Sequence, residues 1–281
     1  AALVIVMSVM NGFRAELFDK IVGLNGHAVV QGYGGRLADW REVLKDVRAT
    51  PGVTEASPLI EQPLLATHEG RVEAILARGM EVRDILENPT LKGKTLAGDM
   101  KLLRPGSERV AIGSRLAQNL GARLGQRLTI INPAGRTTPF GTVPREISYE
   151  IAAIFEVGVY DYDKAFVIMP IEDAQILMLM GDQIGMIELT TTDPDKVNDI
   201  LAPLQPKIAD RAVIVDWKSM NASLFEALAI ERVAMFIVLS IIVLVAVFNI
   251  LSSLIMLVRA KTRDIAILRT MGASRQSLLK I

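Results

Sequence analysis

The longest apolar segment of the chain lies near its C-terminus. From Val233 to Val258 there are 26 consecutive residues without Asp, Glu, Lys or Arg. As a helix rising about 1.5 Å per residue, this segment measures roughly 39 Å and exceeds the ~30 Å hydrocarbon core of a bilayer. A buried helix of a water-soluble domain is the alternative, but such helices seldom run so long without a charge. The pattern therefore predicts one tilted membrane crossing.

Basic residues are concentrated on one side of this segment. Before it, Arg232 is offset by Glu226 and Glu231, whereas the far side carries Arg259, Lys261, Arg263, Arg269, Arg275 and Lys280. Positive charge near a span favours the cytoplasmic side. The C-terminal end is therefore predicted to be cytoplasmic and the larger part before the span extracytoplasmic.

The first residues, AALVIVMSVM, carry no charge and are followed by the polar NGFRAELFDK. They have no preceding basic region and no cleavage site, so they do not form an intact signal peptide. We expect residues 1–19 to be the outer end of an earlier transmembrane helix.

Strand and helix patterns alternate between the two apolar ends. A strand at 27–31 is followed by a helix at 37–49 with an apolar stripe. Pro51-Gly52 ends that helix, and residues 53–57 begin the next strand. A similar series recurs as a strand at 184–190, a helix at 194–204 capped by Asp193, and a strand at 212–216. These two units predict a β-α-β core of about 20–105 and 171–218.

The segment between the two units has a different pattern. It holds a strand at 110–112, a helix capped by Ser114, and strands near 127–132, 149–156 and 164–170. We expect it to form a mainly β subdomain of about 106–170, inserted in the core. The predicted fold is thus an α+β domain of residues 20–225, followed by a stalk and second transmembrane helix at 226–258 and a cytoplasmic segment at 259–281.

Composition narrows the possible chemistry. The 31 basic and 31 acidic residues balance, so no overall field attracts nucleic acid, and the absence of cysteine excludes disulfides and thiolate metal sites. The mean hydropathy of +0.35 suits one large water-soluble part joined to a small membrane part.

No catalytic or nucleotide-binding motif stands out. Gly93-Lys94-Thr95 lacks the earlier glycine of a phosphate-binding loop, and Gly32-Tyr33-Gly34-Gly35 lacks the third glycine of a dinucleotide loop. Both are interpreted as turns. Asp161 and Asp163 alone would make a weak cation site, and a solvated hairpin turn is the preferred interpretation. His27 and His68 form an acid–base pair only if the fold joins them.

Four segments together resemble a known family. They are VMSVMNGFRAEL, NPAGRTTPFGTVPR, AIFEVGVYDYDKAFV and the long run from FEALAIERV to RTMGAS. The chain is similar to LolC/LolE-type lipoprotein-releasing ABC transporter permeases, which belong to the MacB-like superfamily. The resemblance covers nearly the whole chain.

The resemblance implies a multi-pass protein of the bacterial inner membrane with its large domain in the periplasm. Such a permease has four transmembrane helices and transmits the motion of an ABC ATPase, which binds ATP and Mg, so no cofactor is expected on this chain. The implied partners are a second permease subunit, identical or paralogous, acylated lipoproteins, a periplasmic carrier and membrane lipid. The implied activity is extraction of lipoproteins from the outer leaflet and their transfer to the carrier.

Three sets of residues carry the implied roles. The segment Thr262–Ala273 reads as an amphipathic helix with Gly272 as its stop. In the family this helix couples the permease to the ATPase, through residues corresponding to Asp264, Ile265, Ile267, Leu268, Arg269, Met271 and Gly272. A helix lying on lipid headgroups is the alternative.

The second set lies in the loop 132–145, whose three prolines and two glycines are expected to keep it from pairing as ordinary sheet. In LolC-type subunits the matching loop is a hook for the carrier, and LolE-type subunits keep a related loop without that role. An irregular hairpin without a partner is the alternative. The candidate carrier-binding residues are Pro133, Arg136, Thr138, Pro139, Phe140, Gly141, Pro144 and Arg145.

The third set comprises adaptable apolar side chains at the outer ends of the two spans, which could contact acyl chains. These residues are Met7, Met10, Phe13, Met235, Phe236 and Leu239. Contacts with lipid or with other helices are the alternative for each.

Two other functions fit parts of the pattern. A MacB-like efflux permease or a cell-division permease keeps the architecture but changes the cargo, and the loop 132–145 favours lipoprotein release over both. A membrane-tethered sensor or adhesion domain needs no ATPase and leaves TRDIAILRTMGA without a partner.

Overall fold

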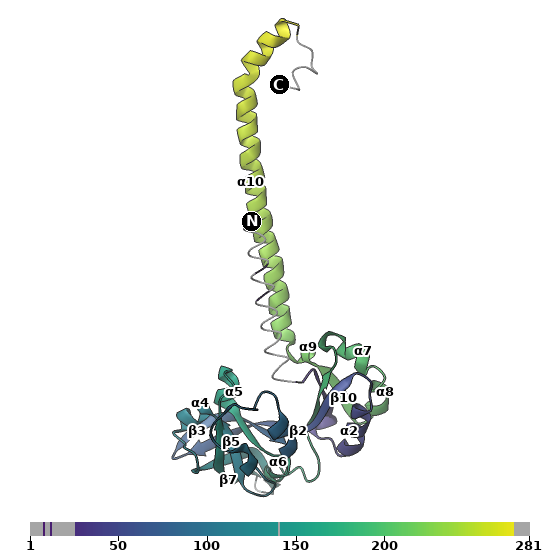
Figure 1. Ribbon diagram of the computed structural model, residues 1–281, viewed down its shortest axis with the longest axis vertical. Coiled ribbons are helices and arrows are strands. Elements are labelled where there is room, and N and C mark those ends of the chain that lie inside the picture. Colours follow the sequence, from purple (N-terminus) through teal and green to yellow (C-terminus); the bar gives the residue numbers. More distant parts are fainter. Residues whose placement is uncertain (1–7, 9–11, 13–25, 140, 273–281) are drawn as a thin grey trace. The chain divides into compact units, whose positions relative to one another are not determined.

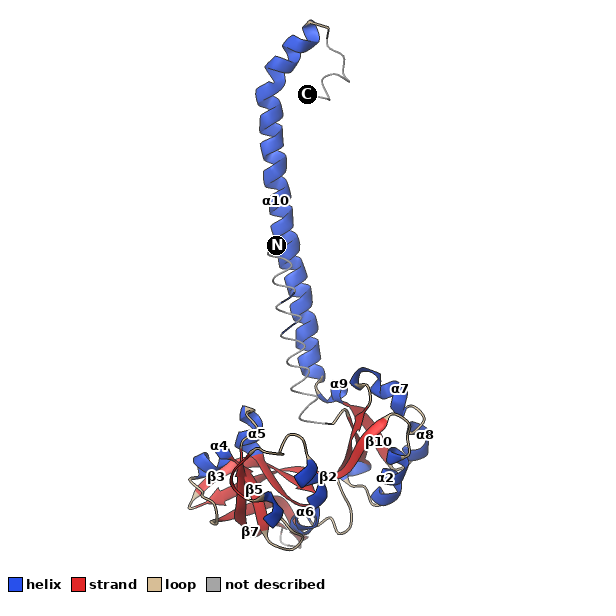
Figure 2. Ribbon diagram, in the orientation of Figure 1, coloured by secondary structure: helices blue, strands red, loops and turns tan. Residues whose placement is uncertain are grey.

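The computed structural model describes residues 8, 12, 26–139 and 141–272. The chain divides into two compact units, Asn11–Met220 and a second unit of Ala1–Met10 with Asn221–Ile281. The described part of the first unit is an α+β domain, and that of the second contains one long helix (Figures 1 and 2).

The strands of the described residues form one ten-stranded sheet in the order β10-β1-β9-β2-β3-β8-β5-β7-β4, with β6 pairing with β2 and β7. Neighbouring strands are antiparallel except for β3 with β8 and β5 with β7. The strands are β1 (Ala28–Gly32), β2 (Val53–His68), β3 (Arg71–Met80), β4 (Thr95–Gly98), β5 (Arg109–Gly113), β6 (Arg127–Thr138), β7 (Gly141–Phe155), β8 (Phe166–Pro170), β9 (Met186–Thr191) and β10 (Ala212–Asp216).

Short helices connect these strands. They are η1 (Tyr33–Gly35), α2 (Trp40–Arg48), α3 (Val82–Glu87), η2 (Met100–Leu102), α4 (Ser114–Leu120), α5 (Tyr160–Ala165), α6 (Ile171–Met178), η3 (Pro194–Lys196), α7 (Val197–Leu201), α8 (Gln205–Ile208) and α9 (Trp217–Met220). The predicted stripe of α2 is confirmed, because Trp40, Val43, Leu44 and Val47 are all buried. Leu37, which was assigned to the same helix, is also buried but precedes it.

One hydrophobic cluster is built from the strands on both sides of β3 and from the segments that connect them. Leu103, Ala153 and Phe155 are fully buried in it, and Ile85 and Ile168 are nearly so. At about 25 cal/mol per Å² of apolar surface, burial of each of the large side chains, such as Leu103 and Phe155, contributes roughly 1.5–3 kcal/mol. This cluster fixes the strands that carry the candidate sites described below.

The predicted strands near 27–31, 184–190 and 212–216 correspond to β1, β9 and β10. The single helix predicted at 194–204 is wrong, because η3 and α7 divide the segment and α8 begins only at Gln205. Asp193 does cap its start, since its side chain accepts a hydrogen bond from the Asp195 amide. The cap predicted at Ser114 is also wrong: Gly113 occupies the cap position of α4, which ends at Leu120 before the left-handed Gly121.

The division into a β-α-β core and an inserted subdomain stays a prediction. The strands assigned to the insertion nevertheless pair with those assigned to the core, since β8 lies beside β3 in the same sheet. The sheet is therefore continuous across the expected boundary.

The second unit contains α10 (Ala222–Thr270), a helix of 49 residues. The sequence from Trp217 onward has a helical pattern that predicts no break before the span. The structure has one, because α9 ends at Met220 and Asn221 separates it from α10. Within the described residues, one helical stretch is long and apolar enough to cross a membrane, Val233–Thr270, with a mean hydropathy of 3.0 in its best window. The uncharged segment predicted to span forms its first part. The expected coupling helix is not separate but is the C-terminal end of α10.

Candidate interaction sites

The loop 132–145 forms a paired β-hairpin. Its backbone register runs from Asn132 opposite Arg145 to Thr138 opposite Gly141. The expectation that its prolines and glycines prevent pairing is therefore wrong. The pairing is irregular between Asn132 and Arg136, where residues 133–135 lie opposite Pro144 alone. Gly135 permits this bulge, since a Cβ there would meet the Val143 carbonyl oxygen at 2.1 Å.

The outer part of the hairpin is exposed to solvent, whereas its base is held by hydrogen bonds of a buried side chain. Pro133, Pro139, Gly141 and Pro144 are exposed, and Val143 is 56% exposed. Arg145 is half-buried, Arg136 and Thr138 lie in the outer part of β6, and Phe140 lies outside the described residues. At the base, buried Asn132 donates from Nδ2 to the Leu177 carbonyl at 3.3 Å and accepts from the Ala134 amide at 3.0 Å.

A second buried polar group lies on α6, the helix whose Leu177 carbonyl bonds to Asn132. Asp173 is buried, its Oδ1 accepts from the Gly106 amide at 3.1 Å, and its Oδ2 has no hydrogen-bond partner. Burial raises the pKa of Asp173 to about 6. Burial, and then the negative charge of Asp173, also raise the pKa of Tyr149 above its ordinary value.

The two chain segments that connect the sheet domain to its apolar ends leave from neighbouring strands. In the β1–β10 pair, Ala28 lies opposite Asp216. The Trp217 amide then donates to the His27 carbonyl at 3.1 Å, and its Nε1 donates to the Pro194 carbonyl at 2.8 Å. Both connections are therefore fixed to the same edge of the sheet.

A buried ion network joins this edge to the middle of the sheet. Arg78 on β3 donates from Nη2 to Glu188 Oε1 on β9 at 2.7 Å, and the same oxygen accepts from the Gly26 amide at 3.0 Å. Arg78 Nε lies 3.3 Å from Glu61 Oε2 without making a hydrogen bond. Burial raises the pKa of Glu61, and the Arg78 charge opposes that rise. Sequence reasoning missed this network, although Arg78 is the one charge in the run Ala74–Met80.

The end of α10 carries the residues proposed for coupling. Exposed apolar side chains there are Ile265 at 39%, Ile267 at 52%, Leu268 at 37% and Met271 at 79%. Asp264 forms an ion pair with Lys261 at 3.1 Å, and Arg269 lies in the last helical turn. Gly272 has the left-handed φ of +95°, and its amide donates to the Arg269 carbonyl at 3.1 Å. The predicted stop at Gly272 is thus confirmed.

The acyl-contact candidates fall in two places. Met7, Met10 and Phe13 lie outside the described residues. Met235, Phe236 and Leu239 lie in α10, where Met235 and Leu239, four residues apart, share a face and Phe236 is 72% exposed.

The other candidates from the sequence serve structural roles. His27 Nδ1 accepts from the Thr191 amide on β9, and burial lowers its pKa, whereas His68 Nδ1 lies 2.8 Å from the Arg127 carbonyl. The two histidines thus bond to different strands. The solvated hairpin turn expected at Asp161 and Asp163 is wrong, because both lie in α5. The Asp163 carboxylate is buried there and accepts from the Val157 and Gly158 amides. No group of three or more His, Cys, Asp or Glu that could hold a metal occurs in the described residues.

These features describe an α+β domain carried by a membrane-spanning helix. A family model, the MacB-like periplasmic core domain, matches residues 1–207. The chain is 35% identical over 284 residues to the lipoprotein-releasing system transmembrane protein LolC of Neisseria meningitidis serogroup B, covering 100% of this chain and 68% of that one. It is 32% identical over 279 residues to LolC of Xylella fastidiosa strain Temecula1, covering 99% and 67%.

A protein with the paralogous name LolE is also among the relatives. The chain is 26% identical over 290 residues to the transmembrane protein LolE of Haemophilus influenzae, covering 100% of this chain and 68% of that one. Among solved structures, the periplasmic region of MacB from Actinobacillus actinomycetemcomitans matches with 10% identity and a TM-score of 0.45, covering 73% of this chain and 95% of that one.

The chain is therefore an inner-membrane protein with a periplasmic domain of the MacB-like type. Within that class it belongs to the LolC/LolE family of lipoprotein-releasing system transmembrane proteins.

Proposed function

We propose that the chain is a multi-pass permease subunit that moves lipoproteins from the outer leaflet of the inner membrane to a soluble periplasmic carrier. The family membership supports the cargo. In this proposal the chain itself is not catalytic: an ABC ATPase binds ATP and Mg, and its motion reaches the periplasmic domain through a second permease subunit and this one.

The hairpin of β6 and β7 is the observation that carries the proposed transfer step. Its tip lies beyond the buried Asn132 and carries the exposed Pro139 and Val143. A carrier that accepts acyl chains must itself offer apolar surface, and burying one large side chain against it contributes roughly 1.5–3 kcal/mol. That range corresponds to about ten- to a hundredfold in affinity.

Replacing Pro139-Phe140-Gly141 with Gly-Ser-Gly tests this proposal. We expect lipoprotein transfer from proteoliposomes to soluble carrier to fall at least tenfold, while ATP hydrolysis and the melting temperature stay unchanged, because the described tip residues Pro139 and Gly141 are exposed. The control is Glu69→Asn at the turn between β2 and β3, where a left-handed residue with a φ of 47° is exposed. Normal transfer by the tip variant would mean that the hairpin does not engage the carrier.

A further inference from the structure

A cleft opens in the sheet domain where β2 and β3 separate. The two strands pair from Leu59 opposite Met80 onward, and beyond Met80 the chain turns away into α3. The earlier half of β2, Val53–Ser57, therefore keeps β9 on one side and has no described strand on the other. The cleft has a volume of about 520 Å³, which is within the usual range for binding sites.

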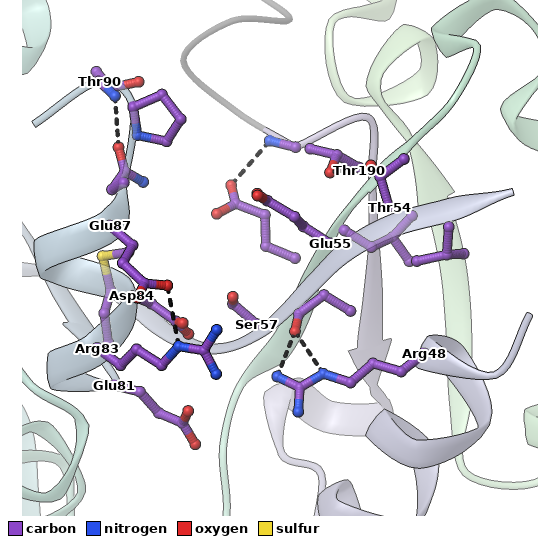
Figure 3. A pocket seen from close by; sticks show the side chains of 18 residues that line it. Arg48, Thr54, Glu55, Ser57, Glu81, Arg83, Asp84, Glu87, Thr90 and Thr190 are labelled. Atoms are coloured by element: carbon purple, nitrogen blue, oxygen red, sulfur yellow. Dashed lines mark hydrogen bonds and ion pairs between the residues drawn. The ribbon is translucent and has the colours of Figure 1, made fainter. Parts of the chain in front are cut away.

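The walls of the cleft are rich in polar groups (Figure 3). Figure 3 shows Thr54, Glu55 and Ser57 on one side and Glu81, Asp84 and Glu87 on the other. Arg48 reaches in from α2 and donates to the Ala56 carbonyl from Nε at 3.0 Å and from Nη2 at 2.7 Å. The Ala56 carbonyl thus has a side-chain partner, while open volume remains beside this part of β2.

Unpaired negative charge remains in the cleft. Four carboxylates, Glu55, Glu81, Asp84 and Glu87, face two arginines there. Arg83 pairs with Glu87 at 3.0 Å, and Arg48 binds the Ala56 carbonyl while its charge partly opposes the rise in the pKa of Glu81. Among the residues that the structure describes, Glu55, Glu81 and Asp84 have no ion-pair partner within 4 Å, and Asp84 Oδ2 is buried without a hydrogen bond. Burial, and then the nearby charge of Asp84, raise the pKa of Glu81. A cation between these carboxylates would relieve their repulsion.

We propose that this cleft binds a short, extended and basic segment of the polypeptide tether that joins a lipoprotein's acylated end to its folded body. The proposal rests on the proposed function. An extended chain fits a space left beside a strand, at about 3.3 Å per residue, and a Lys or Arg on it complements Glu55, Glu81 and Asp84. Gly26, which lies in the wall, follows the predicted membrane segment 1–19 by only a few residues along the chain.

Peptide binding is measured first, with the complete detergent-solubilised complex. The probes are fluorescein-labelled eight-residue peptides that differ only in two positions, both Lys, both Gln or both Glu. We expect the Lys peptide to bind most tightly and the Glu peptide least. The double variant Glu55→Gln with Glu81→Gln should weaken binding of the Lys peptide about three- to tenfold, as expected for two partly exposed ion pairs. Glu156→Gln, an exposed carboxylate outside the cleft, is the matched control.

Lipoprotein release is measured second, in proteoliposomes loaded with one lipoprotein whose tether carries either two Lys or two Gln. We expect the unaltered complex to release the Lys form at least threefold faster at limiting substrate, and the double variant to remove that difference. Equal peptide affinities for the unaltered and double-variant complexes would overturn the inference. A double variant that no longer binds the soluble carrier but still binds the peptide normally would overturn it too, since the occupant of the cleft would then be a folded partner.

The two proposals fail differently. Release that is normal but independent of tether charge leaves the permease function standing and refutes the cleft. No release of either lipoprotein by the unaltered complex refutes the proposed function, and the peptide assay still reports directly on the cleft.

Discussion

Asp173 connects the ionisation of one buried residue to the stability of the sheet domain. Its carboxyl group is buried on α6, with one oxygen bonded to the Gly106 amide and the other without a partner. Since its pKa rises from the ordinary 3.8 to about 6, the folded protein holds the proton more tightly than the unfolded chain does. The corresponding stabilisation is complete below about pH 4 and is lost as the pH rises through about 6.

Replacing Asp173 with Asn therefore gives a pH-dependent result. The amide oxygen still accepts from the Gly106 amide but cannot ionise, so we expect a higher melting temperature than the unaltered protein at pH 7 and a similar one at pH 4. Thermal melting between pH 4 and 7 measures this. Asp199→Asn, which changes an exposed carboxylate on α7, should show no such crossover. A constant difference across the pH range would mean that Asp173 ionises normally.

Arg78 shows how a single side chain can hold three strands. Removing it leaves Glu188 and Glu61 without their cation in a buried site, so Arg78→Met should destabilise the domain by about 3–5 kcal/mol. Adding Glu61→Gln and Glu188→Gln should recover most of that loss, since no uncompensated charge then remains. Denaturant unfolding measures both, and Arg83→Met at the exposed pair with Glu87 should cost under about 1 kcal/mol. Failure of the triple variant to recover would argue against a charge-based cause.

The local spacing of apolar and polar residues predicted those helices and strands whose pattern is contained within a few residues. The α2 stripe, β1, β9 and β10 were found in this way, as was the stop at Gly272. The prediction placed the start of a strand at Val53–Ser57 and gave it no end, whereas β2 continues to His68 and includes Pro58 and Pro63. A proline is tolerated in a strand where its missing N–H meets no partner.

Such a partner-free position is set by the sheet and not by the local sequence. Leu59 accepts from the Gly185 amide on the β9 side, and residues alternate, so Pro63 faces that same side. On that side, the pairing of β2 with β9 stops at Leu59, and its pairing with β6 begins only at Leu65, so neither strand lies opposite Pro63. The hairpin of residues 132–145 was misread for a similar reason, because its bulge places Gly135 where the partner strand approaches closely. The candidate residues were found through the family resemblance, and their roles stay predictions.

The C-terminal end of α10 carries the element-scale prediction. Ile267 and Leu268 are exposed apolar side chains just before the helix ends, and an ATPase groove that buries them would exclude water. Replacing either with Asp should place a charge in that contact at a cost of several kcal/mol and release the ATPase, while membrane insertion persists. Co-purification measures the complex, and Ala266→Asp, on another side of the same turn, is the control. An ATPase that stays bound to both Asp variants would show that this segment does not dock it.

At the scale of the whole molecule, the surfaces of the sheet domain and of α10 require opposite surroundings. The domain buries a core and exposes charged residues, whereas α10 exposes Ile237, Ile242, Val247 and Leu251 along a stretch without a charge. Such a surface is stable only when lipid or other apolar helices cover it. The chain therefore needs a membrane at α10 and water around the domain.

The distribution of charge then sets which side of the membrane holds the domain. Basic residues follow the span at Arg259, Lys261 and Arg263, and moving them across an energised membrane is unfavourable. We expect a periplasm-active reporter joined after Asp182, which lies in an exposed turn of the domain, to be active, and the same reporter joined after Lys261 to be inactive. A cytoplasm-active reporter at the same two positions should give the opposite pattern and controls for expression. Replacing Arg259, Lys261 and Arg263 with Gln should weaken the bias and give activity of both reporters after position 261. If the periplasm-active reporter is inactive after Asp182 and active after Lys261, the domain lies in the cytoplasm, out of reach of any lipoprotein in the outer leaflet.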